Sequence, residues 1–241
     1  MALGCLVSQI CVRVRFDFAR LNPFRPGWLL EYRRIAGEVT WSLIGVAATH
    51  VHGRAYVYVA VNMVGLAALA AINVVGVLFR PVRTMLNAWG RAALPNMAAL
   101  LAAKRVAAFD RVLWQGFAAA TAASVAWYVV LCLAWAPIER HFLGDKYPEA
   151  WSLMLPWAVS AGLSAMEYTV GIALQAAREF KYLAYTTLVG GPLTVVAAVG
   201  AVWWHDYTWT MYGLAFGSIA IMAMEAARLY VVRRRILAET V

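Results

Sequence analysis

The sequence has little charge and almost no cysteine. Only 14% of its 241 residues are charged, whereas a soluble domain of this size carries about 25%. The three cysteines, Cys5, Cys11 and Cys132, are odd in number and lack the spacing of a metal site, which predicts isolated thiols and no disulfide framework. No P-loop, dinucleotide fingerprint, zinc motif or nucleophile elbow is present. We therefore expect no enzyme activity, no catalytic residue, no cofactor and no metal site.

Apolar residues are correspondingly abundant. Hydrophobic residues make up 63% of the chain, and the mean hydropathy is +0.68. Eleven tryptophans and eleven tyrosines add the aromatic residues that collect at membrane–water interfaces. No stretch has the composition of a separate soluble domain. The composition predicts an all-α integral membrane protein.

A helix needs about 20 apolar residues to cross the hydrocarbon core of a membrane. Four runs of the required length stand out, at residues 112–136, 150–175, 182–203 and 209–231. The region 35–79 is apolar enough for two more, and a turn at "NMVG" (62–65) gives a first span of 35–61. A turn at "HVHGR" (50–54) would leave a span of only 15 residues, so we favour the former.

These runs predict six transmembrane helices in one bundle. The domain organisation is a segment at 1–34, a bundle at 35–231 and a basic tail at 232–241. The first of these looks like the tail of a lost span, because its apolar start lacks the basic region of a signal peptide.

The basic residues lie on one side of the predicted bundle. They precede the first predicted span and follow the second, fourth and sixth spans. These residues are Arg33, Arg34, Lys104, Arg105, Arg111, Arg178, Lys181, Arg233, Arg234 and Arg235. The opposite side has only Arg140 and Lys146 among several acidic residues. By the positive-inside rule both termini are expected in the cytoplasm. Because the charge is spread over every cytoplasmic segment, the net charge of +9 does not indicate a nucleic-acid partner.

The stretch "LFRPVRTMLNAWGRAALPNM" (78–97) places arginines directly after an apolar run. On a helical wheel Arg80, Arg83, Asn87 and Arg91 share one side with Asn73 and Gly76 of the preceding run, while apolar side chains lie opposite. Either a surface helix lies along the membrane interface, or a span continues through the stretch and its arginines face a watery cavity. The pattern alone does not choose between these alternatives.

Three segments resemble the second half of a known transporter family. They are "RRIAGEVTWSLIG" (33–45), "AALPNMAALLAA" (92–103) and "FLGDKYPEAWSLMLPW" (142–157). In order and spacing they resemble the C-terminal half of the polysaccharide flippases, the O-antigen exporter type of the multidrug/oligosaccharidyl-lipid/polysaccharide superfamily. The resemblance covers residues 30–235. It implies one bundle of a two-bundle fold in the bacterial cytoplasmic (inner) membrane, with a central cavity that opens to each side in turn.

The resemblance also implies a substrate, a sugar chain on a polyprenyl diphosphate, and cationic residues that bind the diphosphate. It favours the cavity alternative, so Arg80 and Arg83 become substrate-binding candidates, with Asn73 and Asn87 beside them. Full-length members of the family have about twice as many spans as this chain. We therefore expect a half that is completed by a partner N-terminal bundle or is an inactive membrane remnant.

Other polar residues fall inside the predicted spans. His50 and Arg54 share a helix face and either extend the polar lining or mark a simple turn. Glu167 lies well inside the fourth span, where a carboxylate is a candidate for ion coupling. This residue supports an alternative function, a multidrug or cation antiporter half. Glu225 and Arg228, three residues apart, are interpreted as a local ion pair. A membrane glycosyltransferase or polymerase would need catalytic residues in longer outer loops than these.

Overall fold

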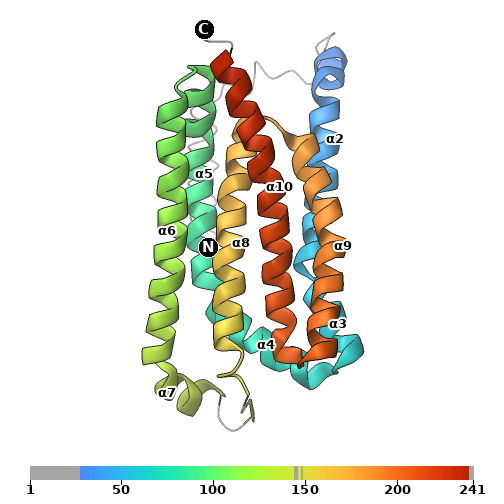
Figure 1. The fold of residues 1–241 in the computed structure, drawn as a ribbon, viewed down its shortest axis with the longest axis vertical. Helices are drawn as coiled ribbons and strands as arrows, with labels where there is room; N and C mark the ends of the chain where they lie inside the picture. Colours follow the sequence, from blue (N-terminus) through green and yellow to red (C-terminus); the bar gives the residue numbers. More distant parts are fainter. Residues whose placement is uncertain (1–27, 144–145, 148, 239–241) are drawn as a thin grey trace. The chain divides into compact units, whose positions relative to one another are not determined.

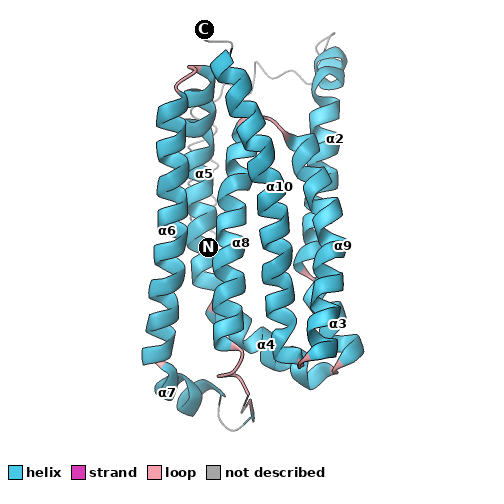
Figure 2. Ribbon diagram, viewed as in Figure 1, coloured by secondary structure: helices cyan, strands magenta, loops and turns pink. Residues whose placement is uncertain are grey.

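The structure is a computed structural model that describes residues 28–143, 146–147 and 149–238. Cys5, Cys11 and most of the predicted segment 1–34 lie outside the described residues. Every regular element within them is a helix, as Figure 2 shows, so the all-α prediction is confirmed there. The chain divides into two compact units, residues 1–40 and 41–241. Helix α2 (Trp28–Gly53) begins in the first unit and ends in the second, which contains all the other helices.

The second unit is built mainly from long helices that lie side by side, α5, α6, α8, α10 and α9 in Figure 1. Its elements, in chain order, are α3 (Ala55–Met63), α4 (Leu66–Leu78), α5 (Arg80–Ala102), α6 (Val106–Leu133), α7 (Trp135–Ile138), a π-helical turn (Glu139–Leu143), α8 (Met154–Ala176), α9 (Phe180–Trp204), a 3₁₀ turn (Tyr207–Trp209) and α10 (Thr210–Ala238). The four clear apolar runs of the sequence correspond to α6, α8, α9 and α10.

Among the described residues, three helical segments are long and apolar enough to cross a membrane, namely α6, α9 and Tyr207–Ala238. Helices α4 and α5 make a fourth if they are taken as one span with a 50° bend. Helix α8 has a suitable length but is less apolar, and it packs against α5, α6 and α10. A multi-pass membrane protein is therefore plausible.

The region 35–79 contains both of the predicted interruptions. At the first, only Arg54 separates α2 from α3. At the second, Val64 and Gly65 separate α3 from α4, and Gly65 has φ = +109°, a conformation that side-chain-bearing residues rarely adopt. The stronger break is thus at the "NMVG" segment.

Small residues set the contact between α9 and α10. Added Cβ atoms at Gly190, Gly217 and Gly213 would meet Ile221, Thr194 and Ala198 across the interface, respectively. Each step of four residues forward along α9 is matched by four residues backward along α10, so the two helices are antiparallel with one register. The four-residue spacing of Gly213 and Gly217 therefore permits close packing of the two helices.

Candidate functional site

The bend between α4 and α5 is held by two tryptophans. The indole N–H of Trp157, from α8, donates to the carbonyl of Ile72 at 2.9 Å. That of Trp127, from α6, donates to the carbonyl of Leu78 at 2.7 Å. Pro81, in the first turn of α5, has no N–H to continue the helical ladder, so a carbonyl before it needs another donor. The bend is therefore a fixed feature, and it places Arg80 at the start of α5.

Helix α5 has one packed face and one open face. Val82, Leu86, Gly90, Ala93 and Met97 are buried, and the helix packs against α6 and α8. The open face carries Arg80, Arg83 and Arg91, all exposed, and the half-buried Asn87. We call these four residues the arginine face. The amphipathic helix predicted from the sequence is confirmed, and it continues through Pro95 to Ala102.

The packing of α5 bears on the two alternatives for this stretch. A helix lying along the membrane interface would have no bundle helix beside its whole length. Here the buried positions run from Val82 to Met97, against two long helices. At 1.5 Å per residue, Arg83 lies about 28 Å and Arg91 about 16 Å from the end of α5 at Ala102. The arginine face therefore runs alongside bundle helices over much of the length of α5.

The other residues predicted to line the polar side do not belong to the arginine face. Asn73 is exposed on α4, beyond the bend. Gly76, predicted to share the polar side, instead packs against Trp157, where an added Cβ would lie 2.7 Å from the indole ring. His50 and Arg54 are exposed. The helix that follows them, α3, packs against α9 and α10, and the structure does not bring these two residues to the arginine face.

Glu167 belongs to a partly buried polar seam between α8, α9 and α10. The hydroxyls of Ser164 and Ser218 are 3.1 Å apart, and Ser218 lies near the Glu167 carboxyl group. Two turns further on, an added Cβ at Gly171 would lie 3.8 Å from Oε2 of Glu225. Ser164 and Gly171 of α8 thus face Ser218 and Glu225 of α10, which means that the two helices run parallel in one register.

Glu225 is the functional candidate that sequence reasoning missed. The predicted ion pair with Arg228 is wrong, because Arg228 makes a bidentate contact with Glu179 at 3.0 Å instead. The Glu225 side chain is 3% exposed, and its Oε1 accepts a 3.4 Å hydrogen bond from Thr186 of α9. A signal for its burial was present, since Glu225 continues the four-residue spacing of Gly213 and Gly217 along α10.

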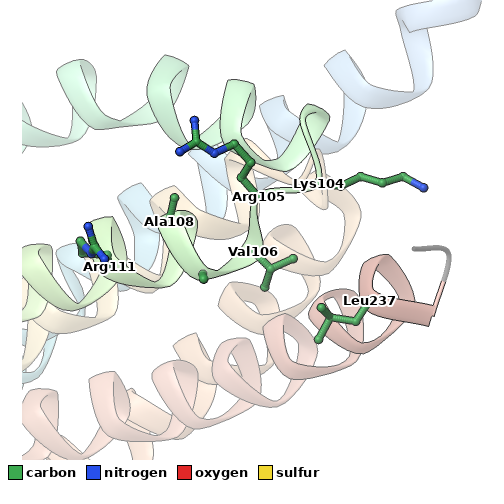
Figure 3. Close-up of a pocket in the computed structure, with 7 residues that line it drawn as sticks. Lys104, Arg105, Val106, Ala108, Arg111 and Leu237 are labelled. Atoms are coloured by element: carbon green, nitrogen blue, oxygen red, sulfur yellow. The ribbon is translucent and has the colours of Figure 1, made fainter. Parts of the chain in front are cut away.

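Basic side chains gather where α5 turns into α6, near the end of α10. A groove there is lined by Lys104, Arg105, Arg111 and the apolar Leu237, among others. Figure 3 shows the Lys104 and Arg105 side chains pointing in different directions, so they do not converge on one ligand. Close by, Arg233 of α10 pairs with Asp110 of α6. This cluster marks one end of the bundle as strongly basic but does not form a built site.

A comparison with protein-family models, curated proteins and solved structures found no match to the chain.

Labelling of single cysteines tests whether the arginine face meets water. In a background without the native cysteines, cysteines at Asn73, Arg80, Arg83 and Asn87 are expected to react with a water-soluble thiol reagent. Cysteines at Val75, Val82 and Leu86, which are buried, are expected to stay unlabelled. Labelling is read by mass spectrometry on the folded, membrane-embedded protein. Unreactive cysteines at 80, 83 and 87 would mean that lipid or another protein covers the face.

Proposed function

We propose that this chain is the substrate-binding bundle of a membrane carrier that moves lipid-linked polysaccharide precursors by alternating access. The observation that supports the proposal most is the arginine face, which lies open on one side of a helix whose other side is packed into the bundle. The carrier performs no covalent chemistry. The arginines bind the diphosphate of the lipid carrier, and the polyprenyl tail stays in the bilayer.

The cost of exposing arginine to lipid supports an aqueous lumen beside α5. An arginine at the centre of a bilayer costs at least about 2.5–3.5 kcal/mol, so arginines at this depth usually line a water-filled path or bind an anion. The planar guanidinium donates two parallel hydrogen bonds to phosphate oxygens, which makes it better suited than an ammonium group to hold a diphosphate. Arg80 and Arg83, one turn apart, present two such groups on the same face.

The proposal includes the finer organisation expected from the sequence. Six spans form one bundle, the basic end faces the cytoplasm, and both termini lie there. The open side of α5 faces a second bundle, and the lumen lies between the two. The antiporter alternative shares this arrangement but assigns the essential step to Glu167, and it gives no role to the arginine face.

Binding of the headgroup by the purified chain tests the proposal. In detergent, the chain is expected to bind a polyprenyl diphosphate more tightly than the monophosphate, and the monophosphate more tightly than the uncharged polyprenol. Native mass spectrometry gives the three affinities under one condition. Equal binding of the diphosphate and the polyprenol would show that only the tail is recognised, and would contradict the proposal.

A further inference from the structure

We propose that the turn between α5 and α6, together with the outer face of α6, is a docking surface for anionic phospholipids of the membrane that the bundle spans. The basic groove at this turn contacts the headgroups, and Trp114 with the apolar residues beyond it contacts the acyl chains. The surface contains none of the four residues of the arginine face. The inference therefore goes beyond the proposed carrier and does not depend on its diphosphate site.

The charge of the groove is positive. Lys104, Arg105 and Arg111 line it, and none of the described residues that line it is acidic. Arg105 and Arg111 are exposed and make no hydrogen bond or ion pair with another described residue. Asp110, the residue before Arg111, is already paired with Arg233 of α10. Two guanidinium groups are therefore available to anions from outside the protein.

The groove lies at the level where two candidate spans end. Helix α6 begins at Val106, directly after Arg105, and the groove is also lined by Leu237, one residue before the end of α10. With 28 residues, α6 is about 42 Å long, whereas the hydrocarbon core of a bilayer is about 30 Å thick. The first turns of a centred α6 therefore reach into the headgroup layer. Arg111 lies about 8 Å from the start of α6, close to the boundary of that layer.

An apolar face of α6 continues from Arg111 into the span. The exposed residues that follow at steps of three and four, on one side of the helix, are Trp114, Ala118, Ala122, Val125 and Val129. The Trp114 side chain is 69% exposed and lies against Phe117, with the ring centroids 5.6 Å apart. Indole rings collect at the boundary between headgroups and acyl chains. Arg111 and Trp114, one turn apart, thus match the polar and apolar parts of one phospholipid.

The directions of the basic side chains favour a layer of headgroups over one enclosed ligand. Figure 3 shows the Lys104 and Arg105 side chains on different sides of the turn. The phosphate groups of a bilayer lie side by side in one plane, so side chains that spread apart can each contact a different headgroup. Clusters of basic residues at the end of a span attract anionic lipids in this way. A single soluble phosphate compound would instead need donors that converge.

Competition between two lipids tests the docking surface. The full chain, purified in detergent, is mixed with equal amounts of phosphatidylglycerol and phosphatidylcholine that have the same acyl chains, and native mass spectrometry counts the lipids that stay bound. The native chain is expected to retain phosphatidylglycerol preferentially. Arg105→Gln with Arg111→Gln is expected to lower this preference by roughly tenfold or more, and each single variant by about fivefold, because each basic side chain contributes separately to the attraction.

A matched control removes the same charge elsewhere. Arg140 and Lys146 are exposed in the segment between α7 and α8, at the other end of the bundle in Figure 1. Arg140→Gln with Lys146→Gln should keep the native preference. The inference is overturned if the native chain retains both lipids equally. It is also overturned if the control loses as much preference as the Arg105 and Arg111 variant, since net charge alone would then attract the lipid.

Two further variants separate the parts of the inference. Trp114→Ala is expected to release both lipids more readily and to leave their ratio unchanged, because an indole ring does not distinguish headgroup charge. Unchanged retention by Trp114→Ala would contradict the role given to the outer face of α6. Arg80→Gln with Arg83→Gln should keep the preference for phosphatidylglycerol, even though the proposed function expects it to lose polyprenyl diphosphate. Failure of the diphosphate site and failure of the docking surface therefore give different results.

Discussion

Gly213→Ala is expected to destabilise the chain by about 1–3 kcal/mol, and Gly213→Leu to prevent α9 from assembling on α10. An added Cβ at this position would lie 2.4 Å from Cα and 2.6 Å from N of Ala198. These are backbone atoms, which cannot move aside as a side chain can. The helices must separate, and the separation would also pull Thr186 away from Glu225. Alanine favours helix over glycine by about 1 kcal/mol, which reduces the loss without reversing it.

Two glycines of α9, the partner helix, make the test specific. Gly200→Ala should be neutral or slightly stabilising, because its Cβ would meet only the ring of Trp204, at 3.5 Å. The stability of Gly190→Ala should fall between those of Gly213→Ala and Gly200→Ala. Its added Cβ would meet the side chain of Ile221, which can shift more easily than backbone atoms. The melting temperature and the yield of monodisperse protein give the order of stability of the three variants. A Gly213→Ala protein as stable as Gly200→Ala would mean that the α9–α10 contact is looser than the structure has it.

The parts of the fold that depend on local periodicity could be predicted from the sequence. The four long apolar runs match helices α6, α8, α9 and α10, and all of these except α8 are long and apolar enough to span a membrane. The two faces of α5 follow from a 3.6-residue period, so Val82 and Leu86 are buried while Arg80 and Arg83 are exposed.

Contacts between distant residues could not be predicted in the same way. Glu225 and Arg228 are neighbours along a helix, and the sequence gives no sign that Arg228 turns to Glu179, 49 residues away. The side chain that caps the bend after Leu78 comes from Trp127, also 49 residues distant. Such partners depend on which helices pack together and in which register. A single sequence contains that information only in its small residues, such as the glycines of α10.

The arginine face gives the second large expected effect, on affinity for a polyprenyl diphosphate. Arg83→Gln is expected to weaken binding by on the order of tenfold or more, because a hydrogen bond to a charged group is worth roughly 1.5–3 kcal/mol. Arg83→Lys should be impaired less, since lysine keeps the charge but loses the two-pronged donor geometry. The double change of Arg80 and Arg83 to glutamine should lose most of the preference for diphosphate over polyprenol.

These substitutions are informative because they leave the fold intact. Neither the Arg80 nor the Arg83 side chain makes an ion pair or hydrogen bond with another described residue, and both are exposed. Their replacement therefore removes charge without opening a cavity. Arg140→Gln, in the exposed turn after α7, removes the same charge away from α5 and should bind as the native chain does. If the double glutamine variant binds the diphosphate as tightly as Arg140→Gln, the arginines do not hold the headgroup, and they serve instead to anchor α5 at a polar boundary.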